Sequence, residues 1–306
     1  MHTRRAVLRA LATEPHSGPA LAERLDVSRA AVWKHIEALR DSGFEIESTD
    51  EGYMLEHIPE YGGDAVALGL DAPFEIRYHD AVKSTNARAR ELAAAGERDT
   101  VVLADRQTGG RGRLDREWNS PSGGIWASLL LRPTIPPADV PVYTLAAAVA
   151  IVDALDEVNA RIKWPNDVLV GDDEQKLAGI LTEMEGEADR VSWVIIGTGI
   201  NANIPEDRLP AEATSLQAQR GPVDRRAVTQ RVLERFDALR TASVETILQA
   251  WRERATTLGK VVRVETPNDT VTGTAVDIEP PGTLVLETDA GRRRVTAGDC
   301  EHLRPA

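Results

Sequence analysis

A glycine-rich segment with three arginines carries the clearest chemical signal in this sequence. Residues 105–126 place Arg111, Arg113 and Arg116 among glycines, directly after the apolar run at 101–104. Glycine lets a backbone approach a ligand closely, and guanidinium groups suit phosphate and carboxylate oxygens. The chain has no Gly-x-x-x-x-Gly-Lys-Ser/Thr sequence, so this is not a P-loop. The segment therefore predicts an anion site, and we expect the anion to be a phosphate.

Further polar segments lie where strands are expected to begin or end. Residues 83–86 (Lys-Ser-Thr-Asn) would stand at a helix N-terminus, which favours anions, although N-capping alone also explains them. Residues 163–167 (Lys-Trp-Pro-Asn-Asp) end a strand, and residues 176–181 begin one with a lysine in a chain that has five lysines against 31 arginines. Residues 197–203 resemble half of a dinucleotide fingerprint but lack its third glycine, so a turn is the better interpretation.

Length and composition limit the class of protein. A chain of 306 residues with 42% hydrophobic and 28% charged residues is typical of two or three globular domains. We see no apolar run of about 18 residues and no signal peptide, and therefore expect a cytoplasmic protein with no membrane partner. The single Cys300 excludes an internal disulfide and a cysteine-based metal cluster. The net charge of −13 argues against binding nucleic acid along the whole chain. We hypothesise that it suits a salt-rich cytoplasm, which an activity optimum at low salt would contradict.

Residues 1–60 predict a winged helix-turn-helix domain. Helices are expected at 4–12, 19–25 and 29–42, and two strands within 44–55. Such an architecture reads DNA through its recognition helix. The candidate DNA contacts are Ser28, Arg29, Ala30, Lys34 and His35. The wing carries four acids and no cation, so a module kept for regulation or dimer contacts is the alternative.

Residues 73–256 predict an α+β domain with a mixed sheet, because strands and segregated helices replace strict β-α-β alternation. The expected strands are 125–131, 161–164, 168–170, 177–183 and 191–197, and the expected helices are 86–95, 143–158, 225–240 and 245–255. Residues 257–306 change to short strands and turns, which predicts a small β-barrel. Its expected strands are 261–264, 273–276, 284–287 and 294–296.

In order and spacing, these segments resemble the biotin–protein ligases, of the bifunctional kind that carries a winged helix and can act as biotin operon repressor. The matching segments are Ser84-Thr85-Asn86, Gln107 to Arg113, Arg116 to Pro121, Lys163 to Asp167, Lys176 to Leu181, Gly199-Ile200-Asn201, and Gly298-Asp299 before Leu303-Arg304. The resemblance covers nearly the whole chain and implies an α+β ligase domain followed by an SH3-like domain. Asp115 departs from the family, which usually has glycine there, and we expect its side chain to point to solvent. The acidic loop 171–175 also looks slightly long.

The resemblance implies a ligation in two steps with ATP and Mg²⁺. The carboxylate of biotin would attack the α-phosphate of ATP, and a lysine of a biotin carboxyl carrier protein or domain would then displace AMP. The implied catalytic residues are Arg111, Arg113, Asp167 and Lys176. The implied biotin contacts are Ser84, Thr85, Asn86, Gln107, Arg111, Gly112, Arg113 and Lys176. The implied ATP contacts are Arg113, Arg116, Trp118, Asn166, Lys176 and Asn201, with Mg²⁺ near Asn166. Operator DNA and a second copy of the chain are the other implied partners.

Three alternatives stay open. A lipoate–protein ligase would share the fold and the chemistry, but the Gly-Arg-Gly-Arg loop speaks against it. A biotin-sensing repressor with a degenerate ligase centre is disfavoured because Arg111, Arg113, Asp167 and Lys176 are all present. A ligase whose winged helix does not bind DNA is the third, and the acidic wing favours it.

Overall fold

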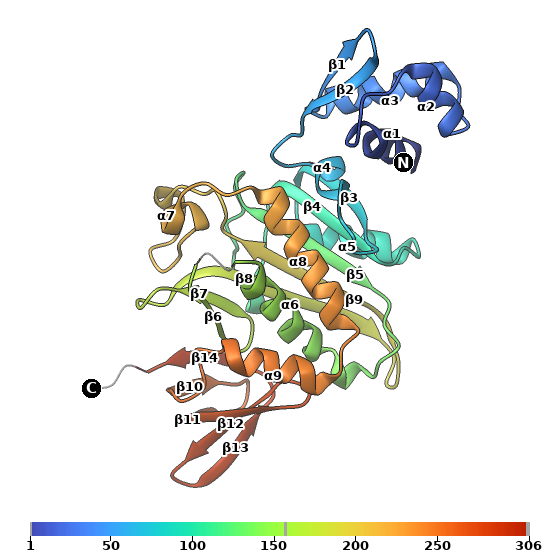
Figure 1. The fold of residues 1–306 in the computed structure, drawn as a ribbon. Coiled ribbons are helices and arrows are strands. Elements are labelled where there is room, and N and C mark those ends of the chain that lie inside the picture. The colour runs from blue at the N-terminus through green and yellow to red at the C-terminus, as the bar shows by residue number, and fades with distance from the viewer. Residues whose placement is uncertain (1, 156–157, 304–306) are drawn as a thin grey trace. The chain divides into compact units, whose positions relative to one another are not determined.

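The computed structural model describes residues 2–155 and 158–303 and divides into two compact units, Met1–Asp71 and Ala72–Ala306 (Figure 1). The first unit is a helix-turn-helix with a two-stranded wing. Its elements are α1 (His2–Leu11), α2 (Gly18–Arg24), α3 (Arg29–Asp41), β1 (Glu45–Thr49), β2 (Gly52–His57) and α4 (Gly63–Ala67). Leu8, Leu21 and Ile36 are at most 1% exposed and form its core. The predicted winged helix is confirmed, whereas α4 was not predicted.

The second unit is built on a seven-stranded mixed sheet. Its strands are β3 (Glu75–Val82), β4 (Thr100–Gln107), β5 (Ile125–Leu131), β6 (Ala160–Lys163), β7 (Asp167–Val170), β8 (Gln175–Gly186) and β9 (Val191–Ile200). The strand order is β3-β4-β5-β9-β8-β7-β6, and β3 pairs parallel to β4 while the other neighbours are antiparallel. The predicted α+β class with a mixed sheet is therefore confirmed.

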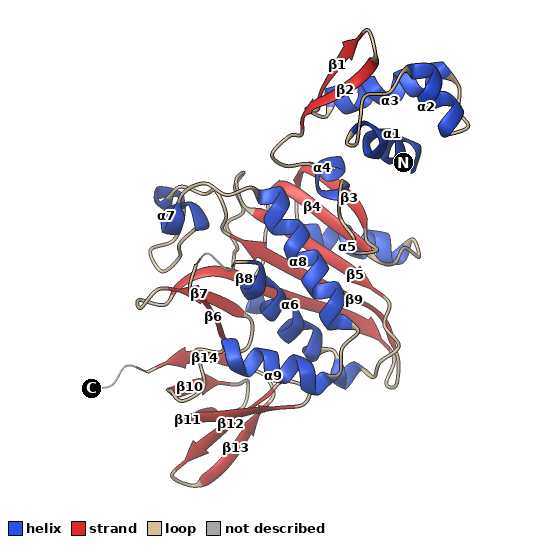
Figure 2. Cartoon of the chain, in the orientation of Figure 1, coloured by secondary structure: helices blue, strands red, loops and turns tan. Residues whose placement is uncertain are grey.

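Helices cover both faces of this sheet. They are α5 (Thr85–Ala94), α6 (Pro141–Ala154), α7 (Leu216–Arg220), α8 (Arg225–Arg240) and α9 (Val244–Arg254), with single 3₁₀ turns at Arg113–Asp115, Pro137–Asp139 and Glu206–Arg208. Figure 2 shows α6, α8 and α9 together over one face. On the other face, α5 packs Ala89 and Leu92 against Val102, Leu130 and Ile195 of the sheet.

Helix α6 is the most apolar helix of the second unit. The window Pro137–Ala154 is long and apolar enough to cross a membrane by length and composition alone, contrary to our reading of the sequence. In the fold, 61% of this window is buried inside the protein, because α8 and α9 cover it. It is thus a core helix by packing. The predicted helix 143–158 ends at Ala154, and residues 156–157 lie outside the described residues.

The C-terminal part is a five-stranded antiparallel sheet. Its strands are β10 (Val261–Glu265), β11 (Thr270–Glu279), β12 (Thr283–Thr288), β13 (Gly291–Val295) and β14 (Asp299–His302), in the order β13-β12-β11-β10-β14. The sequence did not predict β14. Trp164 joins this sheet to the seven-stranded sheet, since its ring N–H donates to the carbonyl of Gly282 at 3.0 Å and its backbone N–H to the hydroxyl of Thr257 at 2.9 Å. The loop before β14 also meets the central domain, since Arg113 donates to the carbonyl of Gly298 at 2.7 Å.

The interpretation of residues 197–203 as a turn is wrong for residues 197–200, whereas residues 201–203 lie outside any helix or strand. Strand β9 continues through Gly197 and Gly199 to Ile200, paired on both sides with β5 and β8. The glycines serve close packing. A Cβ atom on Gly197 would lie 2.2 Å from Oδ1 of Asn86, and one on Gly199 would lie 2.7 Å from Nε1 of Trp118. Glycine in a strand interior often marks such a close approach.

Candidate active site

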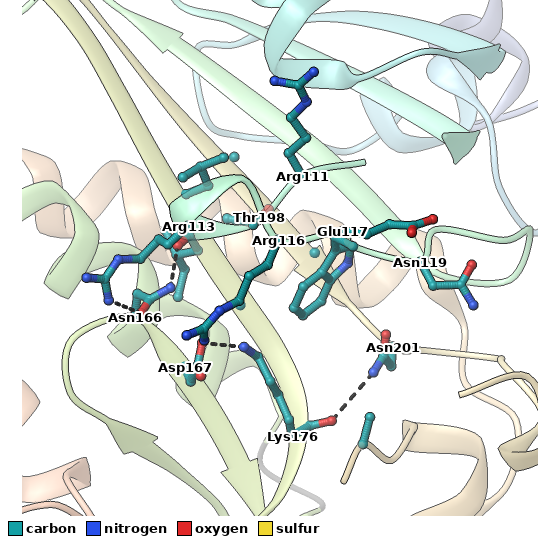
Figure 3. A pocket seen from close by; sticks show the side chains of 18 of the residues that line it. Arg111, Arg113, Arg116, Glu117, Asn119, Asn166, Asp167, Lys176, Thr198 and Asn201 are labelled. Atoms are coloured by element: carbon teal, nitrogen blue, oxygen red, sulfur yellow. Dashed lines mark hydrogen bonds and ion pairs between the residues drawn. The ribbon is translucent and has the colours of Figure 1, made fainter. Parts of the chain in front are cut away.

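A cavity of about 420 Å³ at the ends of β4, β7, β8 and β9 collects every residue that the sequence predicts for catalysis or for biotin and ATP binding (Figure 3). These lining residues are Ser84, Thr85, Asn86, Gln107, Arg111, Gly112, Arg113, Arg116, Trp118, Asn166, Asp167, Lys176 and Asn201. The volume lies within the range of small-molecule sites, about 300–1,000 Å³. One wall is the N-terminus of α5, and another is the segment 108–124 between β4 and β5, which we call the arginine loop.

The wall at α5 is a chain of directed hydrogen bonds. Ser84 caps α5 by accepting from the backbone N–H of Ala87 at 3.4 Å. Oε1 of Gln107 accepts from the backbone N–H of Thr85 at 2.7 Å and from its hydroxyl at 3.1 Å. Nε2 of Gln107 donates to the hydroxyl of Ser120 at 2.9 Å. These bonds fix the orientation of the Gln107 side-chain amide, with Oε1 toward Thr85 and Nε2 toward Ser120.

Lys176 and Asp167 face each other across β7 and β8. Lys176 pairs with Leu169, and Asp167 lies two residues before Leu169, so both side chains are on one face of the sheet. Nζ of Lys176 lies 2.8 Å from Oδ1 of Asp167 and 5.0 Å from the centre of the Trp118 ring. The ion pair is close but not aligned as a hydrogen bond, and Oδ1 has no hydrogen-bond donor among the described residues. Lys176 therefore occupies that oxygen through its charge, and another donor reaches it only when Lys176 moves away.

Arg113 crosses from the arginine loop to two other parts of the chain. Its guanidinium donates to Oδ1 of Asn166 at 2.9 Å and to the carbonyl of Gly298 at 2.7 Å. Burial lowers the pKa of Arg113, and the carboxylates of Asp299 and Asp167 oppose this shift. An arginine remains charged under these conditions. Arg113 thus brings a partly desolvated positive charge beside Asn166, where it would act strongly on an anion.

The other two arginines of the loop lie further out. Arg116 forms an ion pair with Asp299 of β14. Arg111 lies 3.2 Å from Asp115, and its side chain is 63% exposed. In Figure 3 Arg111 points away from the group formed by Arg113 and Lys176. The fold therefore lines the cavity with all three arginines but gathers only two of them near Lys176.

Asp115 occupies a backbone conformation that favours glycine. Both Leu114 and Asp115 have φ of +56°. The left-handed region costs a non-glycine residue roughly 1–2 kcal/mol, with aspartate among the residues that tolerate it best. The side chain of Asp115 is 88% exposed, as we expected from the sequence. A glycine would adopt this backbone conformation without strain.

Trp118 and Asn201 shape the floor of the cavity. The indole of Trp118 packs on two glycines, since Cβ atoms on Gly179 and Gly199 would approach it to 3.0 and 2.7 Å. Its Nε1 is buried with no hydrogen-bond partner among the described residues. Asn201 donates to the carbonyl of Thr214 at 2.9 Å and is 3% exposed, so it braces the start of β8 and the loop beside it.

Sequence reasoning missed several residues at this site. Glu174 and Lys163 line the cavity, and Glu174 accepts hydrogen bonds from Lys260, His302 and Thr256. Although burial raises it, the pKa of Glu174 falls to about 2 because Lys260 and His302 donate to the carboxylate. The signal in the sequence for Glu174 was the acidic loop 171–175 that contains it. Ser120 and Ser128 were also missed, although a lone serine in the apolar strand 125–131 was a signal.

The predicted DNA contacts cluster on the first turns of α3. Ser28 caps this helix by accepting from the backbone N–H of Ala31 at 3.1 Å. Arg29, Ala30 and Lys34 are exposed. His35 is half-buried, and burial together with the charge of Arg4 lowers its pKa. Trp33, which sequence reasoning did not single out, is 58% exposed on the same helix.

Comparison with known proteins places each part of the chain. The Biotin/lipoate A/B protein ligase family matches residues 78–201, the Biotin protein ligase C terminal domain matches residues 257–303, and an HTH domain matches residues 3–54. The bifunctional ligase/repressor BirA of Bacillus subtilis (strain 168) is 41% identical over 304 residues, covering 93% of both chains.

Two further relatives match a smaller share of this chain. A biotin–[acetyl-CoA-carboxylase] ligase of Mycobacterium tuberculosis (strain ATCC 25618 / H37Rv) is 36% identical over 240 residues, covering 72% of this chain and 86% of that protein. The solved structure of the biotin protein ligase from Aquifex aeolicus in complex with biotin and ATP is 29% identical with a TM-score of 0.64. It matches 75% of this chain and 99% of its own.

Proposed function

This chain belongs to the biotin protein ligases of the bifunctional ligase/repressor kind, and on that premise we propose how its cavity performs the two steps of ligation. The protein activates biotin with ATP to biotinyl-5′-AMP and transfers it to a lysine of a biotin carboxyl carrier protein. The observation that carries the proposal is the single cavity in which Arg113, Asp167 and Lys176 face the hydrogen-bonding wall of Thr85 and Gln107.

The first step joins two anions. A carboxylate oxygen of biotin attacks the α-phosphorus of ATP, the bond from that phosphorus to the bridging oxygen breaks, and pyrophosphate leaves. Cations must offset the repulsion and the charge that grows on the phosphate. Lys176 would lie between carboxylate and phosphate, and Arg113 would exchange its bonds to Asn166 and Gly298 for the phosphate oxygens. Arg111 and Arg116 would add charge from the arginine loop, where Gly112 permits close approach.

The remaining binding roles follow the two walls of the cavity. Ser84, Thr85, Asn86 and Gln107 would surround the ureido ring of biotin, and Trp118, Asn166 and Asn201 would line the ATP side. The contact of Lys176 Nζ with the Trp118 ring, 5.0 Å from its centre, supports this assignment, because it places the indole beside the cation that would meet the phosphate.

The second step needs a neutral amine. The free lysine of the carrier has a pKa of about 10.4, so most of it is protonated at neutral pH. Asp167 would orient the amine and accept its proton once Lys176, whose Nζ lies 2.8 Å from Oδ1, has turned to the phosphate. The amine nitrogen then attacks the acyl carbon, the bond to the phosphate oxygen breaks, and AMP leaves. No nucleophile of the protein is needed, and Cys300 is buried with its pKa raised by burial to about 11.

The proposal also includes Mg²⁺, the partners, the location and the domain limits. Among the described residues no group of three His, Cys, Asp or Glu side chains is arranged to hold a metal. Mg²⁺ would therefore arrive with the phosphates of ATP, and Asn166 would offer an oxygen once Arg113 releases it. A cytoplasmic location, a homodimer and the domain limits 1–60, 73–256 and 257–306 are parts of the same proposal.

Pyrophosphate release tests the ligase proposal. Purified protein with ATP and Mg²⁺ is given biotin or lipoate, and we expect release with biotin alone. Lys176→Ala should lower the rate by about 10²–10³-fold, as loss of one preorganised donor does in other active sites. Lys34→Ala, which removes an exposed lysine of the first unit, is the matched control and should leave the rate unchanged. Release with lipoate, or none with either acid, would refute the proposal.

The exposed face of α3 supports repression as a second function. Arg29 and Lys34 can meet phosphates, and the N-terminus of α3 itself favours an anion. We expect retardation of a DNA fragment from the promoter of the protein's own operon, strengthened by biotin with ATP. Equal retardation of unrelated DNA, or none, would leave a ligase whose winged helix does not read DNA, as the acidic wing suggests.

A further inference from the structure

A histidine of the C-terminal part contacts the segment that leads to Lys176. His302 is the last residue of β14, and its side chain is 6% exposed. Its Nδ1 lies 2.8 Å from Oε2 of Glu174 and 3.1 Å from Oε1, and its Nε2 lies 3.0 Å from the hydroxyl of Thr257. Glu174 lines the cavity, whereas His302 and Thr257 do not. His302 therefore acts on the cavity only through its neighbours.

The partners of His302 decide which ring nitrogen carries the hydrogen. The hydroxyl of Thr257 accepts from the backbone N–H of Trp164 at 2.9 Å, so its own hydrogen can go to Nε2 of His302. A carboxylate only accepts, so the ring places its hydrogen on Nδ1, facing Glu174. Burial lowers the pKa of His302, although Glu174 opposes this shift, and the ring is therefore neutral near pH 7. Both ring nitrogens then have a partner.

These hydrogen bonds tie both ends of β7 to His302. Trp164 precedes β7, and Glu174 follows it in the turn that leads to β8. Asp167 begins β7, and Nζ of Lys176 on β8 lies 2.8 Å from its Oδ1. Because the ring contacts the chain on either side of β7, a change at His302 would alter the spacing between the side chains of Asp167 and Lys176.

The backbone of Glu174 is in a conformation that needs support from outside its own turn. Its φ is +54°, in the left-handed region that is unfavourable for a residue with a Cβ atom. Its carboxylate accepts from Lys260 and Thr256 as well as from His302. The hydrogen bonds from Lys260 and His302 bring the pKa of Glu174 to about 2, so the acid is ionised. Loss of the donor on His302 would let the loop 171–175 relax.

We propose that His302 is a positioning residue for the activation of biotin, which sets the place of Lys176 by donating from Nδ1 to Glu174. The inference rests on the proposed ligase function, in which Lys176 leaves Asp167 for the phosphate. The wall at α5 is built from other residues. Binding of biotin without ATP, which would use mainly that wall, should therefore depend little on His302, whereas the rate of pyrophosphate release should depend on it strongly.

Two amide variants test the two ring nitrogens separately. The amide nitrogen of asparagine is as many bonds from Cβ as Nδ1 is, and the amide of glutamine reaches as far as Nε2. His302→Asn therefore keeps the donor to Glu174, whereas His302→Gln keeps only the contact with Thr257. The kcat of biotin-dependent pyrophosphate release should fall less than threefold in His302→Asn. It should fall about 10–100-fold in His302→Gln, because misplacement by about 1 Å can cost 10²-fold.

A matched control makes the same substitution at another histidine. His79→Asn changes a residue of β3 that does not line the cavity, and it should leave kcat unchanged. Calorimetric titration without ATP should give a Kd for biotin within about twofold of the unaltered protein in both His302 variants, since a twofold change is less than one ordinary hydrogen bond contributes. A Kd that rises as much as kcat falls would indicate a general loss of structure and would overturn the proposal.

A double-mutant cycle tests whether His302 acts through Lys176. In the Lys176→Ala background, His302→Gln should lower kcat less than about twofold further, whereas independent effects would multiply. Multiplying effects, or equal kcat values for His302→Asn and His302→Gln, would overturn the proposal. Should His302→Gln not fold, Glu174→Gln removes the carboxylate that the ring holds and should lower kcat by the same range; an unchanged kcat there would overturn it as well. Failure of the ligase proposal is distinct, since the unaltered protein would then release no pyrophosphate with biotin.

Discussion

Replacing Gly197 of β9 with alanine is expected to disturb the cavity wall at α5, which would hold biotin. The added Cβ would lie 2.2 Å from Oδ1 of Asn86, whereas ordinary contacts begin at 3.4 Å, so Asn86 must withdraw by about 1 Å. Its 2.6 Å hydrogen bond from Ser128 would then exceed the 3.5 Å limit of a hydrogen bond. The change acts on packing alone, because alanine introduces no polar group.

The magnitude follows from two costs. Overpacking of a close-packed core costs about 1–3 kcal/mol, and each neutral hydrogen bond that is lost costs about 0.5–1.5 kcal/mol. Gly197→Ala should therefore lower the free energy of unfolding of the second unit by roughly 2–4 kcal/mol. For a unit of this size, each kcal/mol moves the melting temperature by about 2–4 °C, so we expect a fall of about 5–15 °C. The Kd for biotin should rise about tenfold, because Asn86 carries Thr85 with it at the start of α5.

The assay is thermal unfolding with biotin titration, on Gly197→Ala, Asn86→Ala and the double variant. Asn86→Ala removes the side chain that the new methyl group meets. The free energy of unfolding of the double variant should therefore lie within about 0.5 kcal/mol of that of Asn86→Ala, although Gly197→Ala alone is strongly destabilised. A melting temperature of Gly197→Ala within 2 °C of the unaltered protein would refute the steric reasoning, given the estimate of several degrees above. Additive losses in the double variant would show that the methyl group clashes with something other than Asn86.

Three further predictions concern charges. Asp115→Gly should lower the KM for ATP about two- to threefold at low salt, because it removes a carboxylate 3.2 Å from Arg111. The effect should vanish in 1 M salt, and a change in KM that does not depend on salt would contradict this reasoning. The folded pKa of Glu174 is about 2, below its ordinary 4.5, so its stabilisation is complete above pH 4.5 and is lost as pH falls toward 2. Burial lowers the pKa of His302, which adds a loss of stability as pH falls below 6.5. Glu174→Gln should flatten the acid unfolding curve between pH 4.5 and 2, and an unchanged curve would count against this assignment. Lys34→Ala should weaken DNA binding for all sequences alike and reduce the salt slope by about 0.9, and a loss restricted to one sequence would mean that Lys34 reads a base.

Local sequence patterns were sufficient for the family and for many of the elements, although not for α4 or β14. The helix 225–240 and the strand 125–131 were predicted with the bounds that the structure has, because the helix is amphipathic and the strand is a continuous apolar run. Ser28 marks the start of α3 because an N-cap hydrogen bond spans only three residues. The arginine loop and the segment 163–167 identified the family by order and spacing, which is information that the chain carries without folding.

Tertiary structure alone decided how these segments meet. Gly197 and Gly199 were read as a turn, since a glycine that admits a turn and a glycine that admits a neighbouring side chain look alike in one sequence. Ser128 meets Thr85 across 43 positions, and Arg113 meets Gly298 across 185, so neither contact leaves a periodic trace in the chain. Chain periodicity reports only which face of an element is apolar. Packing then decides which buried groups form a hydrogen bond, because a shift of about 1 Å is enough to make or break such a bond.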